Sequence, residues 1–133
     1  MKEDPNYKHS EITDKIIRSF YTVYNKLGFG FLEKVYEHAL LIELRKMGIS
    51  VVNQFMIKVH YDGTEVGNYF ADLFVEEKVI VEIKAAEGLI EEHEAQLVNY
   101  LKATNIEVGL LLNFGKTPSF KRKVFSNNYK TLI

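Results

Sequence analysis

Charged residues interrupt two consecutive apolar runs in the segment 69–85, YFADLFVEEKVIVEIKA. Both runs are rich in Val, Ile and Phe, and the polar stretch 76–78 separates them, so the segment predicts a β-hairpin. Asp72 lies in the first run, and Glu82 and Lys84 lie in the second. Burying charged groups in strands this apolar is unfavourable unless they are paired or bind a metal ion. This conflict is the strongest indication of a functional site in the sequence.

The length of the hairpin turn decides which of these side chains meet. Glu82 and Lys84 are two positions apart, so they project from the same face of their strand. A two-residue turn sets Asp72 opposite Val81, on the wrong face. A three-residue turn at 76–78 sets Asp72 opposite Glu82, although turns of this length usually contain a Gly or Asn that is absent here. We favour the three-residue turn because it gathers two carboxylates and an ammonium group at one point.

Such a group of side chains suits a hard divalent cation. Mg²⁺ and Mn²⁺ take carboxylate oxygens and keep several bound waters, so Asp72 and Glu82 are candidate metal ligands. Lys84 is then placed to orient an attacking water or to stabilise negative charge on a phosphate. The alternative is an exposed edge hairpin on which Glu and Lys pair without a function, and the spacing alone leaves both interpretations open.

The composition is that of a single soluble domain over residues 1–133, with 47% hydrophobic and 26% charged residues. The absence of cysteine excludes disulfides and thiolate zinc sites and indicates a reducing compartment. The chain contains no apolar run long enough for a membrane span and begins with a polar segment, so we expect a cytoplasmic protein without a membrane partner. A net charge of −1 provides no global attraction to nucleic acid, so such binding would need a local basic patch.

The periodicity of apolar residues predicts a mixed sheet flanked by helices. Beyond a loosely ordered arm at 1–9, helical spacing predicts three helices, over 12–27, 31–47 and 90–104. Alternation and apolar runs predict four strands, over 52–61, 65–75, 78–85 and 108–113. Because the last strand is almost entirely apolar and follows a crossover helix, we expect it to lie centrally and parallel to the strand before that helix. The order α-α-β-β-β-α-β indicates an α/β or α+β fold. For the basic tail after Gly115, a final helical turn and an edge strand both stay open.

Two further polar side chains share one face of the helix predicted over 90–104. Gln96 and Tyr100 are four residues apart, and His93 lies one turn before Gln96. Gln96 could hold a substrate phosphate or a metal-bound water, and Tyr100 could donate to a phosphate oxygen. A solvated Gln and a half-buried Tyr explain the same pattern, so this helix face alone does not indicate a site.

Glu33 lies in the first turn of the helix predicted over 31–47, just after the Gly-Phe-Gly break at 28–30. An acidic residue there complements the helix dipole and requires no other explanation. The functional alternative directs Glu33 toward the hairpin carboxylates as a further metal ligand. The four histidines have no metal-ligand spacing, and the chain contains neither a Ser-His-Asp pattern nor a phosphate loop.

The segment 30–36, GFLEKVY, matches the motif that names the GxxExxY protein family. The similarity continues through five further segments, 37–48, 59–63, 71–85, 93–104 and 109–115. The chain therefore resembles this family over residues 12–124. The resemblance implies membership of the PD-(D/E)XK nuclease-like superfamily, whose restriction-endonuclease-like core is a mixed central sheet flanked by helices.

The resemblance also implies a role for each candidate residue. It implies Mg²⁺ or Mn²⁺ ligands at Asp72 and Glu82, with Lys84 as the catalytic lysine. Glu33 matches an acidic residue that many superfamily members contribute from the first core helix. The pair Gln96 and Tyr100 matches the Q-x-x-x-Y signature of exonuclease-type branches. Where the superfamily name has proline, this chain has alanine at position 71, a departure at a position without a ligand role.

Two functions from different classes remain. The first is an Mg²⁺- or Mn²⁺-dependent nuclease that hydrolyses phosphodiester bonds in nucleic acid, with DNA favoured over RNA. In this function Lys84 and Gln96 organise the water and the phosphate. The second is a non-catalytic module of the same fold that binds a protein partner or forms a homodimer, using the 13% of residues that are aromatic. We favour the nuclease.

Overall fold

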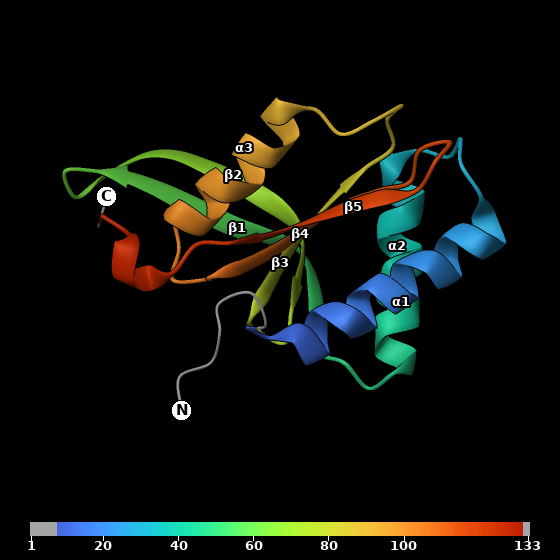
Figure 1. Cartoon of the computed structure of the whole chain (residues 1–133). Coiled ribbons are helices and arrows are strands. Elements are labelled where there is room, and N and C mark those ends of the chain that lie inside the picture. The colour runs from blue at the N-terminus through green and yellow to red at the C-terminus, as the bar shows by residue number, and fades with distance from the viewer. Residues whose placement is uncertain (1–7, 132–133) are drawn as a thin grey trace.

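The computed structural model describes residues 8–131 and contains a five-stranded sheet with helices on both faces (Figure 1). Two helices, α1 (Ser10–Leu27) and α2 (Glu33–Lys46), precede the strands β1 (Val51–Tyr61), β2 (Thr64–Val75) and β3 (Val79–Lys84). Helix α3 (Glu91–Lys102) then leads to β4 (Val108–Asn113), β5 (Ser119–Val124) and the short 3-10 helix η2 (Asn127–Tyr129). The predicted element order is confirmed, and the tail adds both an edge strand and a helical turn. Most of the arm predicted at 1–9 lies outside the described residues.

The strands follow chain order across the sheet, β1-β2-β3-β4-β5. Strands β3 and β4 are parallel and joined through α3, whereas the other neighbouring pairs are antiparallel. All residues of β4 are buried, and this strand lies inside the sheet, as its apolar sequence predicted. None of the helices within residues 8–131 has the length and apolar character that crossing a membrane requires.

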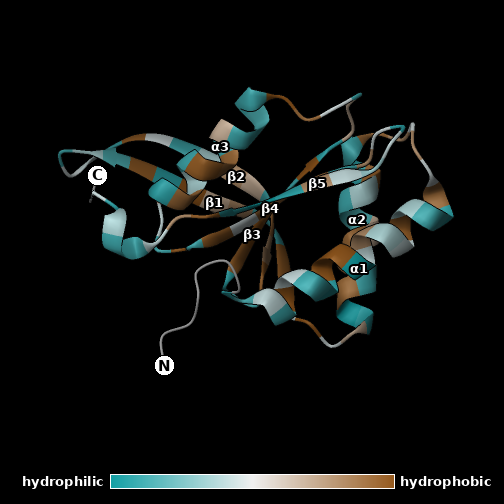
Figure 2. Cartoon of the chain, viewed as in Figure 1, coloured by the Kyte–Doolittle hydropathy of each residue, from teal (hydrophilic) through white to brown (hydrophobic). Residues whose placement is uncertain are grey.

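Two apolar cores cover the opposite faces of the sheet. Odd-numbered residues of β3 belong to the core under α1 and α2, whereas Ile80 belongs to the core under α3. Figure 2 shows apolar residues concentrated in the sheet and on the helix sides next to it. Because side chains alternate along a strand, Glu82 and Lys84 project to the same face as Ile80, the face that α3 covers. Gly109 permits the close approach of α3, since a Cβ there would lie 2.6 Å from Leu97 Cδ1.

The two faces of the β1–β2 ribbon exchange sides at the level of Gln54 and Asp72, and the ribbon is said here to turn over at this point. Leu73 packs in the core under α1 and α2, whereas Ile57 and Ala71 pack in the core under α3. Odd-numbered residues therefore face opposite sides of the sheet on the two sides of this point. Gln54 has a φ of 54° in the middle of the strand, a left-handed conformation that costs a non-glycine residue about 1–2 kcal/mol. The part of the ribbon formed by residues 55–71, here called the distal arm, lies beside α3 (Figure 1).

Candidate functional site

The register of the β2–β3 hairpin brings the two predicted carboxylates together. The turn has three residues, 76–78, and pairs Leu73 with Val81. The next pair in this register is Asp72 and Glu82, so the favoured turn length is confirmed. The regular pairing of backbone groups between β2 and β3 ends at this point.

The turn reaches this register with two acidic residues in the left-handed conformation. Glu76 and Glu77 both have a φ of 53°. Ser50 supports them, because its N–H donates to Glu76 Oε1 at 3.0 Å and its carbonyl accepts from the Glu76 N–H at 2.8 Å. These bonds tie the turn to the segment before β1, which explains how Glu occupies a conformation usually left to Gly or Asn.

Side-chain carboxylates replace backbone carbonyls where the two strands separate. The N–H of Ile83 donates to Asp72 Oδ2 at 2.7 Å, and the N–H of Asp72 donates to Glu82 Oε2 at 3.3 Å. The two carboxyl groups are also close enough to share a hydrogen bond. The backbone therefore fixes both acids side by side.

The environment of Glu82 disfavours its negative charge. Burial raises the pKa of Glu82 to about 9, and the adjacent Asp72 carboxyl contributes to the rise. The Asp72 N–H and the Lys84 ammonium act in the opposite direction without cancelling it. Glu82 therefore keeps a proton at neutral pH, and a cation that binds both carboxylates would replace that proton.

Lys84 and Gln96 meet between β3 and α3, where Lys84 Nζ donates to Gln96 Oε1 at 3.3 Å. Gln96 also bonds the Tyr100 hydroxyl one turn further along α3. Burial, together with the nearby Glu82 and Asp72 carboxyls, raises the pKa of Tyr100 to about 12. The structure thus brings five of the six predicted site residues to one region.

Glu33 is the predicted residue that the structure does not bring into this group. It begins α2 with an exposed side chain. Within residues 8–131, no three His, Cys, Asp or Glu side chains are arranged to hold a metal ion. The position of Glu33 at the start of α2 is explained by the favourable interaction of an acidic side chain with the helix dipole. His93 likewise has a structural contact, because its Nδ1 accepts from the Ile90 N–H at 3.2 Å at the start of α3.

Asn113 is a supporting residue that the sequence reasoning missed. It lies opposite Lys84 in the β3–β4 register and is fully buried. Its Oδ1 accepts from the Ala86 N–H at 3.0 Å, and its Nδ2 donates to the Ala86 carbonyl at 3.1 Å. Gly115 allows this contact, since a Cβ there would lie 2.1 Å from the Ala86 oxygen. The segment that follows Lys84 is therefore held in place. The sequence feature that could have identified Asn113 was a single amide residue at the end of an apolar strand.

Glu37 is a second missed residue, and it shapes the ribbon beside the site. Its carboxylate accepts from Gln54 Nε2 at 2.7 Å, from Asn53 Nδ2 at 3.2 Å and from Lys34 Nζ at 3.4 Å. Gln54 lies opposite Asp72 in the β1–β2 register, between two regular pairs. The two bonds from Asn53 and Gln54 thus hold β1 at the point where the ribbon turns over. Nothing in the local sequence pattern pointed to this role, because Lys34 and Glu37 have the spacing of an ordinary helix-surface ion pair.

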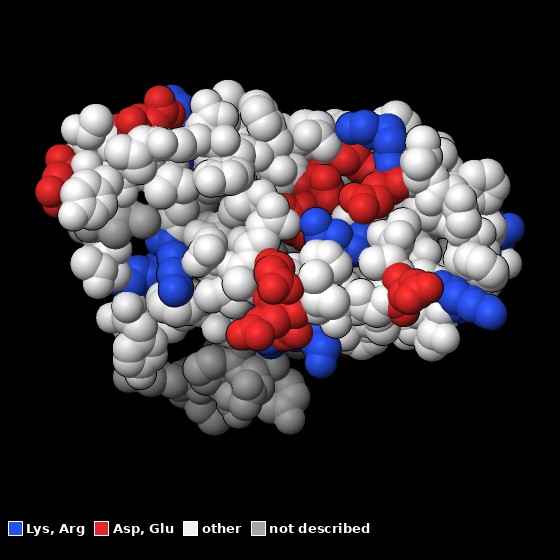
Figure 3. Space-filling view, turned by 90° about the horizontal axis from the view of Figure 1, so that it is seen from above, with Lys and Arg blue, Asp and Glu red and all other residues white. Residues whose placement is uncertain are grey.

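Basic side chains near the sheet edges are engaged in structural contacts. On β5, Lys123 pairs with Glu94 at 2.6 Å, and Arg122 donates to the Lys8 carbonyl. Arg45 donates to the Val51 carbonyl at 3.3 Å, beside the opposite edge strand β1. On the face shown in Figure 3, acidic and basic side chains lie next to one another near the middle of the surface. This face therefore has no uniformly basic band.

Comparison with known proteins places this arrangement in a family. The sequence model of the PD-(D/E)XK nuclease superfamily matches residues 10–124. The chain belongs to this superfamily. Among curated proteins, none matches the chain. A similar solved structure is the crystal structure of SSO0001, with 17% sequence identity and a TM-score of 0.56, over 95% of this chain and 70% of that chain.

The superfamily assignment and the structural likeness together confirm the restriction-endonuclease-like fold expected from the sequence. PD-(D/E)XK nucleases generally depend on a divalent metal ion. At 17% identity, the likeness to SSO0001 supports the fold and nothing further. The chemistry of this chain must therefore be argued from its own site residues.

Proposed function

We propose that this PD-(D/E)XK protein is a nuclease that hydrolyses phosphodiester bonds in nucleic acid with Mg²⁺ or Mn²⁺, and that it belongs to the GxxExxY branch of the superfamily. The observation that carries the proposal is the convergence of two backbone-fixed carboxylates with the Lys84–Gln96 pair on the α3 face of the sheet. We propose DNA ahead of RNA as the substrate.

The donor set fits a hard divalent cation. Mg²⁺ is commonly bound by one or two carboxylates and retains several waters, so Asp72 and Glu82 suffice as protein ligands. The raised pKa of Glu82 also indicates that the pair lacks a compensating positive charge. When bound, the cation would polarise the phosphate and lower the pKa of a coordinated water. Glu33 stays a prediction as a further ligand.

The other side chains are placed to act on the phosphate. The Lys84 ammonium would donate to a phosphate oxygen on which negative charge develops, and Gln96 orients it through the 3.3 Å hydrogen bond. Gln96 also positions the Tyr100 hydroxyl. With a pKa of about 12, Tyr100 stays protonated at neutral pH and can donate a hydrogen bond to a second phosphate oxygen.

The test combines metal binding with cleavage. Mn²⁺ is titrated calorimetrically into wild type, Asp72→Asn and the control Asp14→Asn, which alters an exposed acid on α1. Each protein is then incubated with single- and double-stranded DNA and RNA. We expect Mn²⁺ binding and Mn²⁺-dependent cleavage in wild type and control, and loss of both in Asp72→Asn. Binding without cleavage of any substrate would overturn the nuclease and leave the cation site. Equal cleavage by all three proteins would overturn both.

A specific observation favours a second candidate function, a non-catalytic module that binds a protein partner or a second copy of the chain. The segment around the start of α2 exposes large apolar side chains, with Leu32 80%, Phe29 56% and Phe31 48% exposed. Exposed apolar residues that lie together are typical of interaction surfaces. Sedimentation of wild type and Leu32→Ser would decide whether this segment mediates self-association, because only a dimer that uses it would dissociate in the variant.

A further inference from the structure

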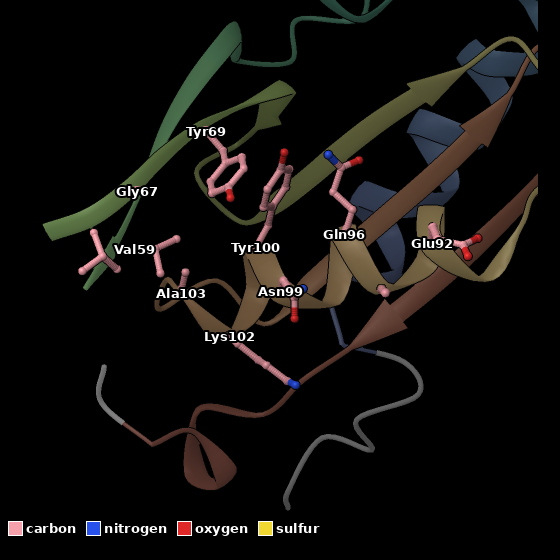
Figure 4. A pocket seen from close by; sticks show the side chains of 11 residues that line it. Val59, Gly67, Tyr69, Glu92, Gln96, Asn99, Tyr100, Lys102 and Ala103 are labelled. Carbon is pink, nitrogen blue, oxygen red and sulfur yellow. The ribbon is translucent and has the colours of Figure 1, made fainter. Parts of the chain in front are cut away.

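A groove of about 590 Å³ lies between α3 and the distal arm of the β1–β2 ribbon (Figure 4). Its lining is mostly apolar and includes Val59, Val66 and Tyr69 from the ribbon and Gln96, Asn99 and Tyr100 from α3. Because the ribbon turns over at Gln54, Val59 and Tyr69 of the distal arm face α3 and line the groove.

The groove is continuous with the proposed cleavage site. Gln96 lines the groove and also accepts from Lys84 Nζ at 3.3 Å. Tyr69 and Tyr100 point toward each other from β2 and α3, with ring centroids 5.9 Å apart (Figure 4). Glu82 lies two residues before Lys84 on the same face of β3, and Asp72 is its neighbour on β2, so the acidic pair lies next to this end of the groove. If a phosphate of a nucleic-acid strand contacts Lys84, the adjoining nucleotide of that nucleic acid can therefore enter the groove.

The lining selects the kind of group that fits. One acidic residue, Glu92, and one basic residue, Lys102, line the groove, so it has no net charge to attract a phosphate. Lys102 also projects away from the two tyrosines (Figure 4) and lies over the Phe125 ring, 5.9 Å from its centroid. A neutral, mostly apolar groove with amide groups suits a planar neutral ligand that has hydrogen-bonding edges.

Tyr69 supplies the open aromatic surface. It is 50% exposed, whereas Tyr100 is 5% exposed and serves as a backing for it. Aromatic side chains of this kind stack on nucleobases in single-stranded nucleic acid, and amides such as those of Gln96 and Asn99 can bond the base edges. A base inside a duplex cannot offer its faces in this way without leaving the stack.

We infer that the groove binds an unpaired nucleobase next to the scissile phosphate, so that the substrate is single-stranded nucleic acid or a single-stranded end. The position of the phosphate in this inference rests on the proposed nuclease function. The preference for an unpaired base rests on the groove and on Tyr69.

Neighbouring residues of β2 provide a matched pair of variants for the test. Tyr69 and Phe70 are 50% and 48% exposed, but only Tyr69 lines the groove, while Phe70 lies opposite Met56 in the ribbon. Fluorescence anisotropy measures the binding of a short labelled single strand and of a blunt duplex of the same sequence to wild type, Tyr69→Ala and Phe70→Ala. The titrations are done in EDTA, so that cleavage does not interfere, and melting temperatures check the folding of both variants.

We expect wild type to bind the single strand about tenfold more tightly than the duplex, and Tyr69→Ala to lose that preference, as expected for one stacked base. Phe70→Ala should keep it. Equal affinity of wild type for both substrates, or equal effects of the two variants, would overturn the inference. A wild type that cleaves nothing but shows the Tyr69-dependent preference would overturn the proposed function and support the groove. Cleavage that depends on Mn²⁺ and Asp72, without any effect of Tyr69→Ala on strand preference, would overturn this inference alone.

Discussion

Glu37 and Glu82 are both almost fully buried, at 3% and 4% exposure, but their surroundings differ. Two side-chain amides of β1 and one ammonium group donate to Glu37. Glu82 accepts from one backbone N–H and faces the Asp72 carboxyl, and the nearby Lys84 ammonium does not offset its burial. A buried carboxylate surrounded by donors has been compensated within the fold, whereas one placed beside a second carboxylate has not.

This difference separates a structural acid from one suited to bind a ligand. The two β1 amides that donate to Glu37 hold the ribbon where it turns over, and their removal would leave the buried Glu37 carboxylate without these partners. Glu82 pairs with the backbone at the point where β2 and β3 separate, and its raised pKa shows that positive charge is lacking. The following predictions test whether the two acids have these distinct roles.

The largest effect is expected for the ammonium group next to Glu82. Replacing Lys84 by Met keeps the length of the side chain and removes its charge, so cleavage should fall by about 10²–10³-fold, the usual effect of losing one group that stabilises developing charge. Mn²⁺ binding, measured calorimetrically, should persist because the carboxylates remain. Lys78→Met is the control, since Lys78 is exposed in the turn of the same hairpin. A cleavage rate in Lys84→Met equal to that of the control would contradict the role of Lys84.

Loss of Glu37 should reduce stability rather than chemistry. Glu37→Ala removes the buried charged acceptor that joins α2 to the Asn53 and Gln54 amides of β1, so the free energy of unfolding should fall by about 2–3 kcal/mol in urea titrations. Glu37→Gln, which preserves the shape and one acceptor oxygen, should lose less. Below the unfolding transition, Mn²⁺ affinity should stay within a few-fold of wild type. A stable Glu37→Ala variant that no longer binds Mn²⁺ would assign Glu37 to the site itself.

The raised pKa of Glu82 should make the stability of the protein depend on pH. In the unfolded chain this acid titrates near its ordinary pKa of 4.5, whereas in the folded protein its pKa is about 9. Between these values the folded state holds a proton that the unfolded state has released. The stabilisation is therefore complete below pH 4.5 and is lost as the pH rises toward 9. Between about pH 6 and about pH 8 in EDTA, the loss should be on the order of 2 kcal/mol.

The control for this slope is Glu82→Gln, which has no such proton and should lack it in the same urea titrations. In wild type, Mn²⁺ should reduce the loss of stability with rising pH, because its binding releases the Glu82 proton. For the same reason the affinity for Mn²⁺ should rise with pH. Parallel stability curves for wild type and Glu82→Gln would show that the Glu82 carboxyl is not perturbed by its burial.

The sequence predicted the role of Glu82 as a site residue and did not predict the structural role of Glu37. The charged residues inside two apolar runs are visible in the local pattern. The register that pairs Asp72 with Glu82 is favoured because it groups these charges, whereas the turn sequence itself lacks the usual Gly or Asn. The two amide donors of Glu37 come from another element, β1, and Gln54, which has a left-handed φ, is one of them. The groove beside α3 depends in turn on the ribbon turning over there. Local periodicity contains no information about such a reversal, and it therefore assigned β1 as a plain strand.

The smallest effect separates the three donors to Glu37. Lys34 Nζ lies 3.4 Å from the carboxylate, but the Lys34 side chain is 58% exposed, so water replaces its contact at little cost. Lys34→Ala should therefore change the free energy of unfolding by less than about 1 kcal/mol, and Asn53→Ala, which removes a hydrogen bond between β1 and the buried Glu37 carboxylate, should cost more. Urea titrations at low and high salt measure both. If Lys34→Ala were as destabilising as Glu37→Ala, the ion pair would be the main compensation of Glu37. Glu37 would then depend on an outside cation much as Glu82 is proposed to do, and the contrast between the two acids would be one of degree.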